Sequence, residues 1–425
     1  MLTVAALCTA WGSVGVVPAA AQQAPSPDTT QAQRQVAGTP YESNRSLAYH
    51  VLASPAYVLH GITRPVGWTV KYLERNFPQI FEPEPQQRGV LPLVELGGPV
   101  GVTGGLALYD NRLFGTNQKA RVDGVVGARG SFEVGLQYER PRLVGPRTSL
   151  SFDANFFWDP EDRFYISDTR SNRDTAEGIF SRRQVDLMTR IQYRSRGGIF
   201  ASAFDVLYEH VDTSPASDER GALLAGLPGF NAVDLLTPRL ELAFDLSRGA
   251  PRAYAGTRLL LRLDYTHDLN SDRFRYGRYV VEVQQYLPVL FFPKTRRLAL
   301  RARLSQVEPM FDGEAVPFYQ LPRLGGQQSL RGFRNDRFRN NGSLLFSAEY
   351  RYPVWSRMDA VFFVDTGQVF NELEAVDVGD FRTTFGGGFH ILAGDGLSAR
   401  FEVGRSVEGT EVILTVKPAF GRTPR

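Results

Sequence analysis

Apolar and polar residues alternate along most of the chain, from residue 90 to residue 420. In the segment SLSFDANFFW, for example, Phe152 and Phe156 share one face, while Ser151 and Asp153 share the other. A period of two places successive side chains on opposite faces of a β-strand. The sequence therefore predicts strands whose two faces meet different surroundings.

The alternation recurs in sixteen segments separated by turns or loops. The predicted strands are 90–97, 100–110, 119–128, 130–140, 148–158, 184–195, 198–210, 235–246, 255–268, 275–287, 296–308, 342–352, 358–368, 382–392, 396–405 and 411–420. Many run to about ten to twelve residues, which is longer than the roughly five or six typical of soluble sheets. A tilted crossing of a bilayer needs about 9–11 residues.

Both faces of these strands fit a membrane. One face is rich in Leu, Phe and Tyr, and the other carries Arg, Asp and Glu in strand after strand. Lipid outside and a polar interior explain both compositions, and an even strand number is usual for such barrels. We therefore expect an all-β fold, a 16-stranded antiparallel transmembrane β-barrel with a short helical N-terminal segment. A soluble β-sandwich, whose strands also alternate, is the alternative.

The connections between the predicted strands fall into two length classes. Those after the fifth, seventh and eleventh strands are long (159–183, 211–234 and 309–341), whereas turns such as 196–198 and 393–395 are short. In bacterial barrels the long loops face the exterior and the short turns face the periplasm. The lengths thus predict which end of each strand lies outside the cell.

The N-terminal part lacks this strand pattern. Residues 1–21 form a mildly apolar run that ends in three alanines, which predicts a signal peptide, with an uncleaved membrane anchor as the alternative. Residues 22–88 are expected to be a disordered, Pro-rich tail with a short helical stretch at 44–77. The predicted outer-membrane barrel then occupies 89–420.

Composition and charge narrow the function. The chain has 48 basic and 45 acidic residues, and a net charge of +3 gives no reason to expect nucleic acid binding. The single cysteine, Cys8, excludes a disulfide scaffold and a zinc site made of cysteines. We expect no metal, no cofactor and no enzyme activity, since no nucleophile, base and orienting group are spaced as catalysis requires. In particular, spacing places no Ser or Asp partner near His210 or His390.

The connection 309–341 is unusual because it holds five arginines between Arg323 and Arg339. It is either a solvated surface loop or a loop folded back into the lumen. In the second case Arg331 could meet Glu349 and Asp365, which fall on the inward phase of the next two predicted strands. Two carboxylates can grip one guanidinium, and shielding from water strengthens such a pair.

Three segments in and after this loop resemble a known family. They are LGGQQSLRGF (Leu324–Phe333), LLFSAEYRYP (Leu344–Pro353) and FFVDTGQVF (Phe362–Phe370). Together they resemble the BamA/TamA-like outer-membrane assembly barrels, also called the bacterial surface antigen family. That family carries an Arg-Gly-aromatic tip on the loop between strands eleven and twelve, followed by acidic residues on the next two strands.

The resemblance implies a lock between the loop and the barrel. Arg331 would be the lumenal anchor, with Glu349 and Asp365 as its partners. The loop tip would be completed by Gly332 and Phe333, and the motif of strand thirteen by Gly367.

The resemblance also implies a function, namely insertion or translocation of polypeptide or lipid at the outer membrane. The partners would be outer-membrane lipids and a periplasmic or membrane protein as client. The POTRA domains that usually serve such barrels are not found in residues 22–88, which are too few and show no strand pattern. The alternative function is a passive pore that favours anions, or a surface structural protein.

Overall fold

The computed structural model describes a large part of the predicted barrel. The described residues are 88–98, 101–165, 177–224, 226–248, 255–289, 296–311, 313–355, 357–393 and 396–415. The predicted signal peptide, the Pro-rich tail with its helical stretch and the end of the last predicted strand lie outside them. Among the described residues, no helix is both long and apolar enough to cross a membrane.

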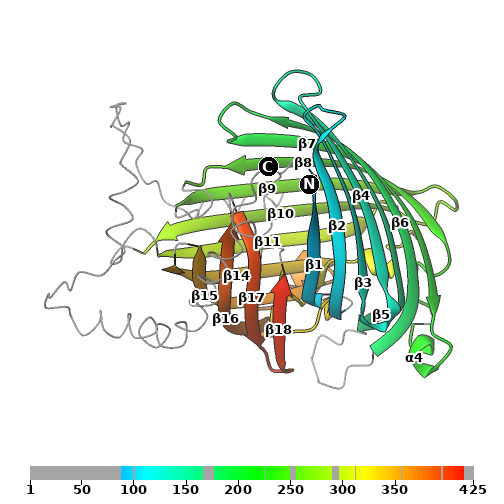
Figure 1. The fold of residues 1–425 in the computed structure, drawn as a ribbon. Coiled ribbons are helices and arrows are strands. Elements are labelled where there is room, and N and C mark those ends of the chain that lie inside the picture. Colours follow the sequence, from blue (N-terminus) through cyan, green and yellow to red (C-terminus); the bar gives the residue numbers. More distant parts are fainter. Residues whose placement is uncertain are drawn as a thin grey trace, which may run out of the picture. The chain divides into compact units, whose positions relative to one another are not determined.

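Sixteen antiparallel strands form one closed barrel, in which each strand pairs with the barrel strands before and after it, β11 pairs with β14, and β1 pairs with β18 (Figure 1). The barrel strands are β1 (Arg88–Gly98), β2 (Gly101–Leu113), β3 (Gln118–Gly127), β4 (Phe132–Pro141), β5 (Thr148–Tyr165), β6 (Glu177–Arg194), β7 (Phe200–Pro215), β8 (Val233–Asp245), β9 (Gly256–Asp268), β10 (Arg275–Pro288), β11 (Arg297–Pro309), β14 (Gly342–Trp355), β15 (Met358–Phe370), β16 (Arg382–Ala393), β17 (Gly396–Arg405) and β18 (Thr410–Thr415). The predicted fold class is confirmed.

The alternation read from the sequence separates the two faces of the barrel wall. On β9 the neighbours Leu263 and Tyr265 are exposed, whereas Asp264 between them is buried. Closing the sheet removes its edges and turns one face of every strand toward a common interior. The exposed apolar residues therefore form the outer surface, and the charged residues line the lumen.

The first long loop was predicted to be longer than it is. The prediction ended the fifth strand at Trp158 and began the next at Gln184, whereas β5 continues to Tyr165 and β6 begins at Glu177. Pro160 lies in this extension, where the β5–β6 register shifts between Asp159 and Asp162. Such a bulge accommodates a proline without ending the pairing.

The connection between β11 and β14 folds into small elements of its own. They are the 3₁₀ helix η3 (Phe318–Gln320) and the two-residue strands β12 (Arg323–Leu324) and β13 (Phe338–Arg339), which pair with each other. The other helical elements of the described residues are α4 (Glu219–Ala222), η2 (Ala128–Gly130), η4 (Leu373–Ala375) and η5 (Val378–Asp380).

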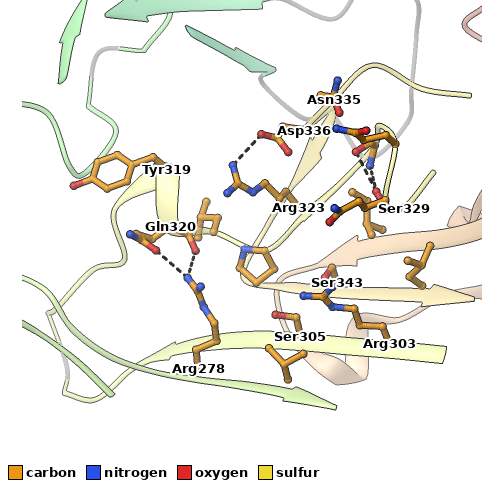
Figure 2. Close-up of a pocket in the computed structure, with 18 of the residues that line it drawn as sticks. Arg278, Arg303, Ser305, Tyr319, Gln320, Arg323, Ser329, Asn335, Asp336 and Ser343 are labelled. Atoms are coloured by element: carbon orange, nitrogen blue, oxygen red, sulfur yellow. Dashed lines mark hydrogen bonds and ion pairs between the residues drawn. The ribbon is translucent and has the colours of Figure 1, made fainter. Parts of the chain in front are cut away.

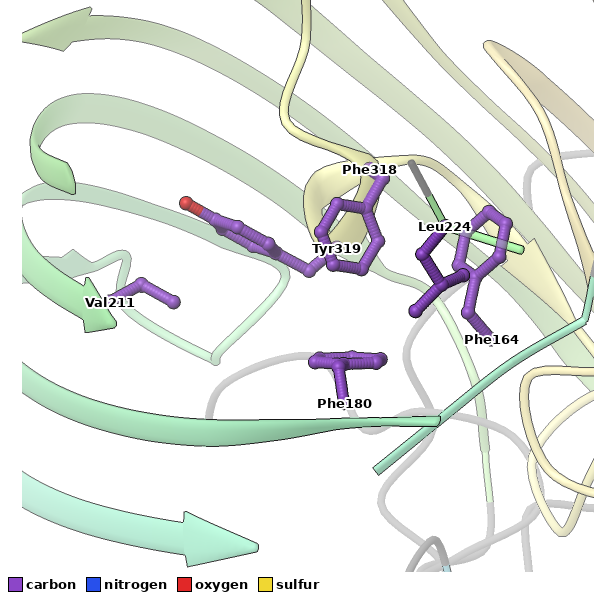
Figure 3. Packing of buried hydrophobic residues seen from close by; sticks show 6 residues of the cluster. All are labelled: Phe164, Phe180, Val211, Leu224, Phe318 and Tyr319. Carbon is purple, nitrogen blue, oxygen red and sulfur yellow. The ribbon is translucent and has the colours of Figure 1, made fainter. Parts of the chain in front are cut away.

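An aromatic cluster attaches the start of this loop to the wall (Figure 3). The ring of Phe318 meets Phe180 of β6 edge-on at 5.0 Å and Phe164 of β5 at 5.3 Å. Leu224 and Val211 complete the contact, and each of these side chains is buried. Burying several large apolar side chains is worth a few kcal/mol in total, so this cluster holds the loop against β5 and β6.

Candidate functional site

The tip of the β11–β14 connection places Arg331 inside the barrel. Its neighbours Leu330 and Phe333 pack in an apolar cluster with Leu324 and Phe338 of the β12–β13 hairpin. The rings of Phe333 and Phe338 meet edge-on at 5.0 Å. This small core gives the hairpin a defined shape, and the guanidinium of Arg331 points out of it toward the wall.

Arg331 is bound by carboxylates from three different strands. Its Nε donates to Asp365 Oδ2 at 2.7 Å and its Nη2 to Asp365 Oδ1 at 2.8 Å, which is a bidentate pair with β15. Its Nη1 donates to Glu349 of β14 at 2.6 Å and to Glu402 of β17 at 3.1 Å. Arg331 is 1% exposed and all three carboxylates are fully buried. We call these four residues the anchor cluster.

Neighbouring side chains satisfy the remaining atoms of the anchor cluster. Arg351 donates to Glu349 at 2.8 Å, and Arg400 and His390 each contact Glu402 at 2.8 Å. The guanidinium carbon of Arg331 also lies 3.6 Å from the centre of the Phe363 ring. Burying a charge is costly unless it is paired and hydrogen-bonded, and here three arginines face three carboxylates. The cluster is therefore close to charge balance.

Glycines let the loop backbone lie directly on the wall. A Cβ on Gly332 would come within 2.5 Å of the backbone of Arg405, and one on Gly404 within 2.5 Å of the carbonyl oxygen of Arg331. On β15, a Cβ on Gly367 would come within 3.0 Å of Leu324 of the loop. At Gly332 and Gly404 the clash is with backbone, so any side chain there would separate the loop tip from the strands that hold it.

The structure brings together the charged residues that the sequence singled out, since Arg331 bonds to both Glu349 and Asp365. Gly332 lies beside them at the tip. Phe333 belongs to the apolar core of the hairpin, and Gly367 lies where β12 meets β15. These last two do not touch the guanidinium and instead shape the loop and its seat.

Sequence reasoning missed Glu402, Arg400, His390 and Arg351. Glu402 lies on β17 between the exposed Phe401 and Val403, so the alternation marked its inward position. Nothing in the sequence distinguished it from the other inward charges of the barrel.

A second group of polar contacts continues the loop toward β1. Gln327 donates to Glu95, and Asn335 Nδ2 donates to the carbonyl oxygen of Gly97 at 2.5 Å. Arg337 pairs with Glu408 in the β17–β18 turn at 2.8 Å. The loop thus contacts β1 and the turn that leads into β18.

The expectation that His210 has no Ser or Asp partner is wrong. Its Nδ1 lies 2.7 Å from Asp234 Oδ1, because β7 and β8 pair these two residues in register. Spacing along the chain could not show a pairing that depends on the register of neighbouring strands. Tyr208 donates to the same carboxylate at 2.6 Å. Within the part of the chain that the structure describes, no group of residues is arranged to hold a metal ion.

One family profile matches most of the chain, and solved structures share its fold. The sequence profile described as the Omp85 superfamily domain matches residues 112–404. The fold is similar to that of BamA from Haemophilus ducreyi lacking POTRA domains 1–3, with a TM-score of 0.56 and 15% identity over 77% of this chain and 69% of that chain. No curated protein matches the sequence.

Two further solved barrels share the fold. CdiB from Acinetobacter baumannii is similar at 13% identity with a TM-score of 0.52, and the match covers 77% of this chain and 59% of that chain. CdiB from Escherichia coli gives 13% identity and a TM-score of 0.51, with 77% and 61% covered. The chain therefore spans about three fifths of each CdiB chain.

Proposed function

This chain belongs to the Omp85 superfamily as an integral β-barrel of the bacterial outer membrane, and we propose that it inserts or translocates polypeptide or lipid there. The observation that carries the proposal is the anchor cluster, in which one loop arginine is bound by carboxylates of β14, β15 and β17. The proposed partners are outer-membrane lipids and a periplasmic or membrane protein as client.

In this proposal Arg331 locks the loop in the lumen. The loop reaches across the interior, since Gln320 donates to Glu209 of β7 at 3.1 Å while Arg331 binds Asp365 of β15. Because a bound loop crosses the lumen, we propose that clients pass through the wall of the barrel and not through an open central channel. Gly332, Phe333 and Gly367 support the lock by shaping its tip and seat.

The β1–β18 seam supports the same proposal. Among the described residues, which end at Thr415 in β18, Leu96 is aligned with Leu414 across this seam. In this proposal the wall opens there, where each backbone hydrogen bond that breaks costs about 0.5–1.5 kcal/mol. Clients would enter the membrane through that opening.

The test is to deplete the protein in its own host and to quantify the outer-membrane proteome and the surface lipids. The proposal predicts a selective loss of particular proteins or lipids, restored by the wild-type gene and by Arg334→Ala but not by Arg331→Ala. Arg334 is a suitable control because its side chain is 60% exposed and lies 3.9 Å from Glu177. An envelope unchanged except for the barrel itself would contradict the proposal.

A second candidate function is a passive pore that favours anions. The observation in its favour is the arginine-rich lumen, where Arg262, Arg278 and Arg303 line one cavity. Recording purified protein in planar bilayers separates the two functions. Insertion or translocation predicts a low, fluctuating conductance, because the loop blocks the lumen. A wide, steady, anion-selective conductance would favour the pore.

A further inference from the structure

A cavity of about 390 Å³ lies between the loop and the inner wall of the barrel (Figure 2). The loop side is formed by residues 319–325, 327–329 and 335–336, and the wall side by residues of β9, β10, β11 and β14. This volume is many times what one water molecule needs. The cavity is separate from the anchor cluster, because none of the four anchor residues lines it.

The lining of this cavity carries an excess of positive charge. Arg262, Arg278, Arg303 and Arg323 line it, and Asp336 is the one carboxylate among its lining residues. Asp336 is already engaged, since it accepts from Arg323 at 2.9 Å and from Arg339 at 3.2 Å. The loop thus adds no free negative charge to the arginines of the wall.

The wall arginines are incompletely neutralised. Arg262 lies 3.2 Å from Glu241, but Arg303 is 3.7 Å from its nearest acidic partner, Glu282. Glu282 also accepts a hydrogen bond from Gln284 at 2.6 Å, which occupies one of its oxygens.

Arg278 differs from the other arginines of this cavity in having no carboxylate partner among the described residues. Its Nη2 donates to the backbone and side-chain oxygens of Gln320, at 2.5 and 3.1 Å, as Figure 2 shows. No carboxylate of the described residues lies within ion-pair distance of it, and its Nε is buried without a hydrogen-bond partner. A buried charged donor left without a partner costs free energy, so a ligand that accepts from it would be bound favourably.

Two hydroxyl groups lie on the wall between Arg278 and Arg303. Ser305 of β11 and Ser343 of β14 are aligned partners in the sheet, and both line the cavity and are buried. Ser305 is also aligned with Val280, two residues from Arg278, and Arg303 is two residues from Ser305 on its own strand. Residues two apart on a strand share a face, so the two guanidinium groups and the two hydroxyl groups face the same space.

We propose that this cavity binds a phosphate-type oxyanion, either a free ion or the phosphate of a lipid headgroup. Two guanidinium groups and two hydroxyl groups offer more donors than the two oxygens of a carboxylate can accept. A phosphate group accepts from several directions at once and pairs well with the planar fork of arginine. The proposal does not depend on insertion or translocation activity, because it concerns a ligand of the barrel interior.

Titration calorimetry with inorganic phosphate, at low salt and in a phosphate-free detergent, tests the proposal on the whole protein. We expect one site, with affinity at least about ten-fold lower in the double variant Arg278→Gln/Arg303→Gln, because each lost charge-assisted bond is worth roughly a ten-fold change. The matched control is Arg258→Gln, since Arg258 is also a lumenal arginine of β9, paired with Asp245 at 2.9 Å, but does not line the cavity.

A second arm identifies the source of the phosphate. The protein is reconstituted in phosphatidylglycerol vesicles and extracted, and native mass spectrometry then counts the retained lipid. Lipid retained by wild type and lost in the double variant supports a headgroup, whereas phosphate binding without retained lipid supports a free ion.

The proposal is overturned if wild type binds neither probe, or if the double variant binds both as well as wild type does. Should the double variant fail to fold, Ser305→Ala/Ser343→Ala removes the two hydroxyl groups and keeps every charge. That variant is expected to weaken phosphate binding by a few-fold, and unchanged binding in it would contradict the proposed site.

Discussion

Two arginines of the same lumen, Arg331 and Arg278, differ in how fully their charge and their hydrogen-bond donors are paired. Arg331 is nearly inaccessible and bonds to three carboxylates. Arg278 bonds to one neutral glutamine, and its Nε has no partner. A cation bound by several carboxylates holds structure together, whereas a cation without a carboxylate partner can bind something else. The residue type is the same, and its surroundings decide its role.

The difference arises from where each arginine is located and from which groups lie within bonding distance of it. Arg331 enters from the loop and reaches carboxylates that already stand on three strands, so the loop and the wall complete each other. Arg278 stands on the wall, and the loop brings it only the oxygens of Gln320. The loop therefore closes one site and leaves the other open.

Replacing Arg331 should have the largest effect. Arg331→Ala leaves Asp365, Glu349 and Glu402 with one positive charge too few in a buried site, which costs about 3–5 kcal/mol. We expect the folded barrel to lose its anomalous gel mobility at a clearly lower temperature. The control is Arg334→Ala, whose exposed ion pair is worth at most about 1 kcal/mol. Equal temperatures for wild type and Arg331→Ala would contradict the lock.

The glycine contacts test the seat of the loop without changing any charge. A methyl group at position 404 would come within 2.5 Å of the Arg331 carbonyl oxygen, so Gly404→Ala should push the tip from the wall at a cost of about 1–3 kcal/mol. Limited proteolysis of the loop measures this displacement. Gly104→Ala is the matched control, because a Cβ there meets no atom within 4 Å. Identical cleavage rates in the two variants would show that the close approach is unimportant.

A double substitution separates charge balance from bonding at the anchor. Asp365 bonds to Arg331 and, at 3.5 Å, to Thr384, so it becomes the least compensated carboxylate when Arg331 is lost. Asp365→Asn should therefore restore about 1–2 kcal/mol to Arg331→Ala, although it destabilises wild type. The measurement is the same gel-mobility temperature in all four members of the cycle. Additive losses would mean that the two residues do not interact.

The smallest expected effect concerns the ion pair of Asp336 with Arg323, which lines the cavity. Burial would raise the pKa of Asp336, but the positive charges of Arg323 and Arg339 more than offset it and hold that pKa below its ordinary value of 3.8. A lowered pKa contributes stability above the ordinary value, and this stability is lost as pH falls through the folded value. Because Arg323 is 45% exposed, the contribution is about 1 kcal/mol or less. Asp336→Asn should remove this part of the acid sensitivity, seen as a smaller temperature loss between pH 6 and pH 3. The same loss of unfolding temperature in wild type and in Asp336→Asn would contradict this contribution of Asp336.

The sequence predicted the barrel because alternation is a local property of each strand. It also predicted that Arg331 could meet Glu349 and Asp365, because a loop motif and two inward phases are visible along the chain. It could not predict Glu402, whose meeting with the loop tip depends on closure of the sheet to β17. The pairing of His210 with Asp234 and the cavity beside Arg278 depend on strand register and on the path of the loop, which local patterns do not specify.

The most direct test of the central claim, that Arg331 holds the loop tip inside the barrel, is chemical accessibility of that tip. Phe333 is 2% exposed and lies two residues from the anchor. In a Cys8→Ser background, Phe333→Cys should react slowly with a membrane-impermeant maleimide and much faster once Arg331→Ala is added. The same reaction rate with and without Arg331 would contradict the account.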